Sequence, residues 1–178
     1  PSSAASDVYK RQHMDSVTIL VASSGKNVAL AEAFEHQLTS KGIPFSTLHL
    51  DDLALPMYTT EQEKKGTKMP GFKAASDEIK AAKGLIVCAP EYNGSMPPVL
   101  NNFIAWLSTS TDDFREHFNG KFVALATHSG GGGHNLMTSM RIQFSHLGAN
   151  VLGRVAIVNS SKPINLKTIE ALVDGVSA

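Results

Sequence analysis

Five short strand-like runs alternate along this chain with longer stretches of helical periodicity, and the first and third of these runs, VTILVA and GLIVCA, are apolar almost throughout. Such short runs, apolar throughout, are typical of parallel strands that are buried on both faces. The alternation predicts βαβ units, and therefore an α/β domain whose parallel sheet is covered by helices on both faces. The expected strands are residues 17–22, 44–50, 84–89, 121–127 and 151–158, and the expected helices are 26–41, 70–83, 97–109, 134–147 and 164–176.

The chain of 178 residues suits one compact domain, which we expect over residues 14–178. Residues 1–13 lack apolar periodicity and precede Met14, so they are interpreted as a cloning remnant outside the fold. Residues 51–69 form a polar connection whose charge run, 61–65, is predicted to be a solvated surface. No signal peptide and no apolar run long enough for a bilayer is evident, which leads us to expect a cytoplasmic protein.

Charge and cysteine content exclude several classes of partner. Basic and acidic residues both number 16, so the formal net charge is zero. A balanced chain without a basic block argues against nucleic acid or a membrane surface as the main partner. The single cysteine, Cys88, cannot form an internal disulfide and is predicted to be a small core residue, with a redox thiol as the alternative. Scattered histidines without an H-E-x-x-H pattern, and the absence of G-x-S-x-G, argue against a metal site and a serine hydrolase.

Three loops that follow predicted strands carry unusual chemistry. In a parallel sheet, the loops between a strand and the next helix open at one edge, where ligands bind at a switch in strand order. The first loop contains Ser23, Ser24, Gly25, Lys26 and Asn27 just before a helix. Backbone N–H groups at a helix N-terminus favour a phosphate, although Ser and Asn are also ordinary helix caps. The loop matches neither a Walker motif nor the G-x-G-x-x-G spacing.

A glycine run follows the fourth strand. Ser129, Gly130, Gly131 and Gly132 lack bulky side chains, so the backbone there could lie close to a flat ligand. A flexible surface turn is the alternative, and the adjacent His128 is interpreted as an ordinary histidine at the end of the strand.

The third loop, 90–95, joins these two into one hypothesis. Pro90 and Gly94 shape the backbone, while Glu91, Tyr92 and Asn93 supply polar and aromatic groups. Tyr92 could lie against a ring, and the amides near Asn93 could hydrogen-bond its edge. A phosphate loop, an aromatic platform and a glycine wall together indicate a site for flavin mononucleotide (FMN).

At these residues the sequence resembles the NADPH-dependent FMN reductase family, which includes quinone, azo-dye and chromate reductases. The resemblance is carried by PEYNGSMPPVLNN with a following Trp, by SGGGGHNLMTSMRIQFSHLGANV and by LALPMY. It implies a flavodoxin-like three-layer sandwich with strand order 2-1-3-4-5. It also implies non-covalent FMN with its phosphate at the first loop, its isoalloxazine bordered by residues 90–94, and its pyrimidine side at residues 129–132. The first loop is more compact than is usual in the family, and Asn101 and Ala105 depart from the family's Lys and Asp.

The family also implies an activity and an assembly. NADPH or NADH would pass hydride to flavin N5 in a ping-pong reaction, and a small-molecule electron acceptor would then take the electrons. The flavin carries this chemistry, so no catalytic side chain is expected and Glu91 is predicted to be structural. A flavodoxin-type electron carrier, or a flavin-binding module without turnover, is the alternative; the neutral composition argues against an acidic carrier.

Members of the family are homodimers or homotetramers, with Phe103, Trp106 and Leu107 as candidates for either subunit contact or core. The sequence leaves open the acceptor, the preferred nucleotide and the choice between dimer and tetramer.

Overall fold

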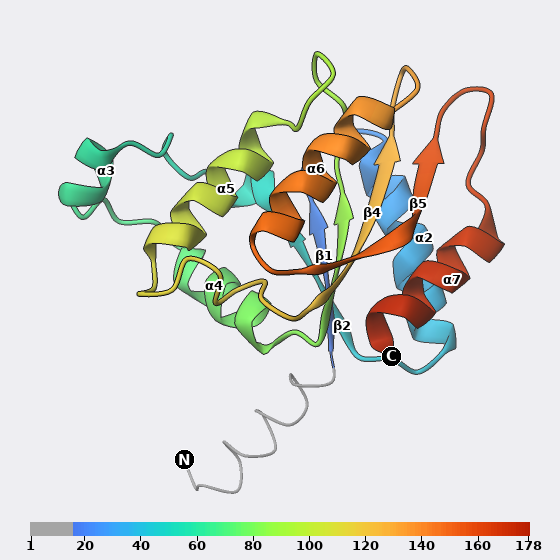
Figure 1. The fold of residues 1–178 in the computed structure, drawn as a ribbon, viewed down its shortest axis with the longest axis horizontal. Coiled ribbons are helices and arrows are strands. Elements are labelled where there is room, and N and C mark those ends of the chain that lie inside the picture. Colours follow the sequence, from blue (N-terminus) through green and yellow to red (C-terminus); the bar gives the residue numbers. More distant parts are fainter. Residues whose placement is uncertain (1–15) are drawn as a thin grey trace, which may run out of the picture.

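The computed structural model describes residues 16–178 and is organised around a five-stranded parallel sheet (Figure 1). The strand order is β2-β1-β3-β4-β5, as the family resemblance implied. The strands are β1 (Val17–Val21), β2 (Phe45–His49), β3 (Gly84–Cys88), β4 (Phe122–His128) and β5 (Asn150–Val158). The expected remnant at residues 1–13 lies outside the described residues.

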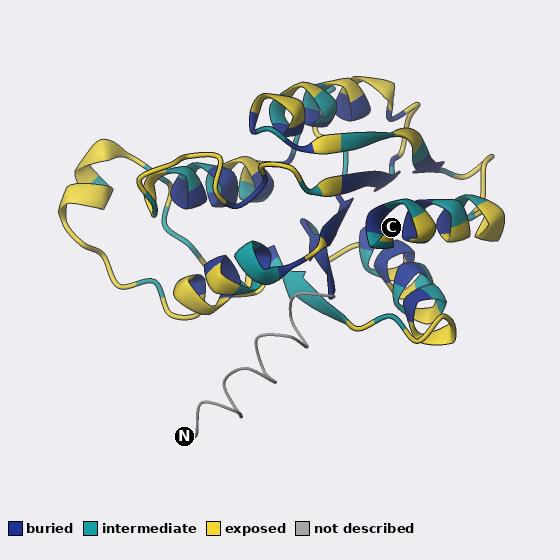
Figure 2. Ribbon diagram, turned by 60° about the horizontal axis from the view of Figure 1, so that its bottom comes forward, coloured by how far each residue is buried: buried dark blue, intermediate teal, exposed yellow. Residues whose placement is uncertain are grey.

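Helices cover both faces of the sheet, which confirms the three-layer sandwich. Figure 2 shows their buried sides turned toward the strands. One face is covered by α2 (Asn27–Ser40) and α7 (Leu166–Ser177), and the other by α4 (Phe72–Ala81), α5 (Pro98–Thr109) and α6 (His134–His146). All these elements lie within two residues of the bounds expected from the sequence.

Burial on both faces explains the continuous apolar strands. In β3, Leu85 and Val87 belong to the core beneath α4, α5 and α6, whereas Ile86 and Cys88 belong to the core beneath α2 and α7. Neighbouring side chains of a strand point to opposite faces, so a strand between two helical layers needs apolar residues at every position. Cys88 is fully buried, which confirms its core assignment, and this burial raises the pKa of its thiol well above the ordinary value. The thiol therefore stays protonated.

The connection between β2 and α4 is more ordered than the sequence indicated. It contains a 3₁₀ turn, η1 (Leu50–Leu53), and a short helix, α3 (Thr60–Lys64), whose start is capped by the Thr59 hydroxyl accepting from the Gln62 N–H at 3.1 Å. The charge run lies mainly in α3, which stands away from the sheet in Figure 1 and is largely exposed. The prediction of a solvated surface is confirmed, while the helix there was not expected.

Two side chains of α5 fix the segment that precedes α3. The Asn102 amide accepts from the Tyr58 N–H at 2.7 Å and donates to the Pro56 carbonyl at 3.0 Å. The Trp106 indole N–H donates to the same Pro56 carbonyl at 2.8 Å. Trp106, Phe103 and Leu107 are all nearly or fully buried within the chain. These three side chains are therefore core residues, and the alternative that they form a subunit contact is wrong.

None of the helices in residues 16–178 is long and apolar enough to cross a bilayer.

Candidate functional site

The three loops singled out in the sequence meet at one edge of the sheet. They follow β1, β3 and β4, which are adjacent and parallel in the order β1-β3-β4. Because the carboxyl ends of parallel strands lie at the same edge, residues 23–27, 90–95 and 129–133 share the upper edge of the sheet in Figure 1. The fold thus brings together all the residues predicted for the site.

The first loop presents polar groups at the start of α2. The Ser23 hydroxyl oxygen accepts from the Gly25 N–H at 2.8 Å, which leaves its own proton free to be donated. Ser24 and Lys26 are exposed, and α2 begins at Asn27 with Lys26 as the preceding residue. The first N–H groups of a helix have no partner within the helix and carry its positive dipole end. This loop therefore offers hydroxyl, backbone and ammonium donors side by side.

Asn27 has a different role in this loop from that of its neighbours. It is 1% exposed, and its Oδ1 accepts from the His128 N–H at 2.7 Å while its Nδ2 donates to the His128 carbonyl at 3.2 Å. Both ends of the amide thus bind the backbone at the end of β4. The side chain fastens the first loop to the end of β4, just before the glycine loop, so only the backbone N–H of Asn27 could donate to a ligand.

The loop after β3 is closed by a tight turn. Tyr92 and Ser95 exchange two backbone hydrogen bonds, each of 3.0 Å, around Asn93 and Gly94. Both central residues have positive φ, 51° and 75°, as in a type I′ turn, for which Asn-Gly is the favoured sequence. The turn lifts Tyr92 to the surface, where it is 52% exposed. This geometry explains why the loop after β3 contains the sequence Tyr-Asn-Gly-Ser.

Glu91 joins this loop to the glycine loop. Its Oε2 accepts from the Ser129 hydroxyl and from the Gly133 N–H, both at 3.0 Å. Ser129 is 5% exposed, and its hydroxyl oxygen also accepts from the Gly131 N–H at 3.1 Å. The carboxylate is therefore committed to holding two loops together, in keeping with its predicted structural role.

The glycine loop combines an open part with a tightly packed one. A Cβ on Gly130 would meet nothing within 4 Å, and on Gly131 only the Ser129 hydroxyl oxygen at 4.0 Å. On Gly133, which has φ +69°, it would lie 2.9 Å from a Thr127 methyl and 3.3 Å from an Ile157 methyl. Gly133 is thus required by the turn into α6, whereas Gly130 and Gly131 leave their backbone accessible from outside.

Two supporting contacts were not predicted from the sequence. The Asn159 amide, just after β5, donates to the Gly131 carbonyl at 3.3 Å. The buried Thr127 hydroxyl donates to the Ala89 carbonyl at 2.6 Å and so ties the ends of β3 and β4. The contact of Asn159 could have been suspected from the sequence, because an Asn lies directly after the predicted fifth strand. Among residues 16–178, no group of three or more His, Cys, Asp or Glu side chains could hold a metal ion.

Fold and loops together define a flavodoxin-like α/β protein with a candidate ligand site at the carboxyl ends of β1, β3 and β4. The family model described as NADPH-dependent FMN reductase matches residues 16–162. The chain belongs to this family.

Known proteins similar to the chain include several reductases. It is 32% identical to the NADPH azoreductase of Bacillus sp. (strain OY1-2) over 62% of the chain and 60% of that protein. It is 30% identical to the quinone reductase of Escherichia coli (strain K12) over 56% of the chain and 53% of that protein. These matches span little more than half the length of each relative. The fold is similar to that of FerB, a flavoenzyme NAD(P)H:(acceptor) oxidoreductase from Paracoccus denitrificans, with a TM-score of 0.72, 19% identity and coverage of 90% of this chain and 96% of FerB.

Proposed function

We propose that this protein is an FMN-dependent NAD(P)H oxidoreductase that transfers electrons to a small organic acceptor. The observation that carries the proposal is that side chains join the three loops at one edge of the sheet. Asn27 binds the first loop to the end of β4, where the glycine loop begins, and Glu91 binds the 90–95 loop to the glycine loop. Membership of the NADPH-dependent FMN reductase family supports the same activity.

The chemistry of the loops fits FMN. The exposed hydroxyl and ammonium groups of residues 23–26, with the N-terminus of α2, would hold its phosphate. Tyr92, Asn93 and Gly94, between Pro90 and Ser95, would border the isoalloxazine. The backbone of Gly130, Gly131 and Gly132 would approach its pyrimidine side, and it is open at Gly130 and Gly131. The structure supplies the small residues and free surface that such a planar ring requires.

FMN, when bound, supplies a carrier that accepts two electrons from NAD(P)H and releases them to an acceptor. The protein's contribution is binding, orientation and preorganised dipoles. The backbone N–H groups of Gly130 and Gly132 would donate to an electron-rich ring edge, whereas the Gly131 N–H donates to the Ser129 hydroxyl. Together with the Asn159 amide, this bond fixes the loop before the ring binds, so little reorganisation is needed. Glu91 is occupied by its two donors and is not a proton carrier.

The test is steady-state NADPH oxidation by protein reconstituted with FMN. We expect FMN-dependent oxidation of NADPH with a benzoquinone or an azo dye as acceptor, because the similar proteins are named quinone reductase and azoreductase. Protein that retains FMN but does not oxidise NADPH or NADH would contradict the proposal and favour an electron carrier. Protein that retains no FMN would show that the three loops have been misassigned.

A substitution in the glycine loop tests where the ring binds. Gly131→Asp should leave the fold intact, because Gly131 does not need a positive φ and an added Cβ has room. The new carboxylate should repel the electron-rich edge of the flavin and lower FMN affinity about tenfold, equivalent to about 1.4 kcal/mol. Thermal unfolding of the apoprotein gives the control for folding, and flavin fluorescence titration gives the affinity. An unchanged affinity would place the ring elsewhere.

We further propose that the protein works as a homodimer or homotetramer in the cytoplasm. The reduced, buried Cys88 suits a reducing compartment. Light scattering coupled to size exclusion would measure the assembly; a monomer at micromolar concentration would contradict it.

A further inference from the structure

A groove begins directly beside the glycine loop. It has a volume of about 370 Å³ and lies between α6 and the edge strand β5. Its lining residues are His134, Met137, Thr138, Arg141, Ile142, Gly153, Val155, Ile157 and Lys162. His134 directly follows Gly133, so the upper end of the groove adjoins the proposed flavin site.

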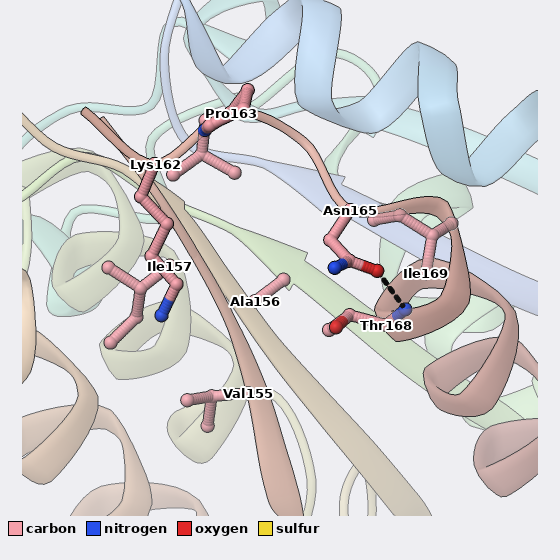
Figure 3. A pocket seen from close by; sticks show the side chains of 9 residues that line it. Val155, Ala156, Ile157, Lys162, Pro163, Asn165, Thr168 and Ile169 are labelled. Carbon is pink, nitrogen blue, oxygen red and sulfur yellow. Dashed lines mark hydrogen bonds between the residues drawn. The ribbon is translucent and has the colours of Figure 1, made fainter. Parts of the chain in front are cut away.

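The turn after β5 links the groove to the flavin loop. Asn159 and Lys162 exchange backbone hydrogen bonds of 2.9 and 3.2 Å, and the Asn159 side chain donates to the Gly131 carbonyl. Lys162 is therefore carried by a short turn that is itself attached to the glycine loop. Figure 3 shows its side chain extended alongside Ile157. On the other face of β5, the small cavity drawn in that figure also has Lys162 at its border.

The groove is positively charged and lacks compensating carboxylates. The segment 117–169 contains no Asp or Glu, and every residue that lines the groove belongs to this segment. Neither Arg141 nor Lys162 makes an ion pair with a carboxylate within residues 16–178. The nearest acid of the adjoining loop, Glu91, does not line the groove and is bound to Ser129 and Gly133.

Arg141 is held in place by an irregularity of the sheet. The register of β4 against β5 shifts between Val123–Val151 and Leu125–Val155, so extra residues of β5 bulge outward. The Arg141 guanidinium donates to the Leu152 carbonyl at 2.8 Å and, at 3.3 and 3.4 Å, to those of Val151 and Gly153. Its charge is thereby fixed at the groove without being neutralised. The apolar surface comes mainly from Ile142, which is 67% exposed, and from the half-buried Val155, while the buried Met137 and Ile157 lie at the floor of the groove.

We propose that this groove binds the 2′-phosphoadenosine end of NADPH. An apolar surface suits the adenine ring, and two cations without acidic partners suit the dianionic 2′-phosphate. Lys162, exposed at the end of a short turn, contacts the phosphate, while Arg141 contributes a fixed positive field. The proposal rests on the proposed function and extends it: the protein prefers NADPH to NADH, and this groove is the source of that preference.

The first test compares the two nucleotides. Lys162→Gln should lower the ratio of kcat/KM for NADPH to kcat/KM for NADH about tenfold, because one charge-assisted contact to the 2′-phosphate is lost. Lys167→Gln is the matched control, since Lys167, at the start of α7, is also an exposed lysine but does not line the groove. An equal effect on both nucleotides, or none, would overturn the assignment.

The second test does not depend on turnover. Adenosine 2′,5′-bisphosphate should bind the FMN-loaded protein about tenfold more tightly than adenosine 5′-monophosphate in titration calorimetry, with an affinity that falls as salt rises. Lys162→Gln should remove this difference. If wild-type protein oxidises neither nucleotide but still shows the Lys162-dependent difference, the proposed function fails and the groove assignment stands. If it oxidises NADPH but binds both probes equally, the groove assignment alone fails.

Discussion

Replacing Glu91 by Ala is expected to lower FMN affinity about 100-fold and the free energy of unfolding by about 2–4 kcal/mol. The carboxylate accepts two hydrogen bonds from groups that are themselves almost without solvent contact, the Ser129 hydroxyl and the Gly133 N–H. Hydrogen bonds to a charged group contribute about 1.5–3 kcal/mol each, and the donors left behind would be desolvated and unpaired. A loss of about 2.8 kcal/mol in binding corresponds to a 100-fold change.

The effect should be specific to the lost acceptor. Glu91→Gln keeps a side-chain oxygen that can accept from Ser129 or Gly133, so we expect it to retain most of the affinity that the Ala variant loses. Flavin fluorescence titration and urea unfolding of the apoprotein measure the two quantities separately. If the Ala variant were to bind FMN as tightly as wild type, the two loops would not need this tie to form the site.

Acidification from pH 7 to pH 4 should lower the free energy of unfolding by about 3 kcal/mol through His117 alone. This imidazole is fully buried, its Nε2 lies 2.8 Å from the Ser76 hydroxyl oxygen, and within residues 16–178 its Nδ1 has no hydrogen-bond partner. The pKa of His117 is lowered from 6.5 to about 4, mainly by burial and in part by nearby Lys80 and Lys121, while Glu116 and Asp77 partly oppose the shift.

The sign follows from the order of protonation. As the pH falls below 6.5, the unfolded chain binds a proton at this position while the folded protein does not, so unfolding becomes more favourable. The loss accumulates down to about pH 4, where the folded protein also binds the proton, and each unit of pKa difference corresponds to about 1.4 kcal/mol.

The His117→Gln variant isolates this contribution. A glutamine amide can still hydrogen-bond the Ser76 hydroxyl but does not titrate in this range. The difference between wild type and variant, from urea unfolding at pH 7, 6, 5 and 4, removes the contribution of all other groups. Parallel pH profiles for the two proteins would show that His117 titrates in the folded protein as it does in the unfolded chain.

Local sequence patterns were sufficient for the five strands, for the five long helices and for the edge at which the three candidate loops meet. Continuous apolar runs identify strands buried on both faces, because a central strand exposes neither side to water. Asn93-Gly94 specifies a turn with two positive φ angles through the conformational preferences of those two residues. The carboxyl edge follows from parallel order, so the three loops were correctly expected to meet there.

Partners distant in the chain could be identified only from the tertiary structure. Asn27 was predicted to hold a phosphate, yet its amide binds the backbone of a residue 101 positions away. Phe103 and Trp106 could equally have lain in the core or at a subunit contact, and the packing of α5 on the sheet buries both. Arg141 and Lys162 gave no signal individually, because their common groove exists only once α6 packs beside the β5 edge. Periodicity and turn preference depend on adjacent residues, whereas the partner of a polar side chain depends on which elements the fold places next to it.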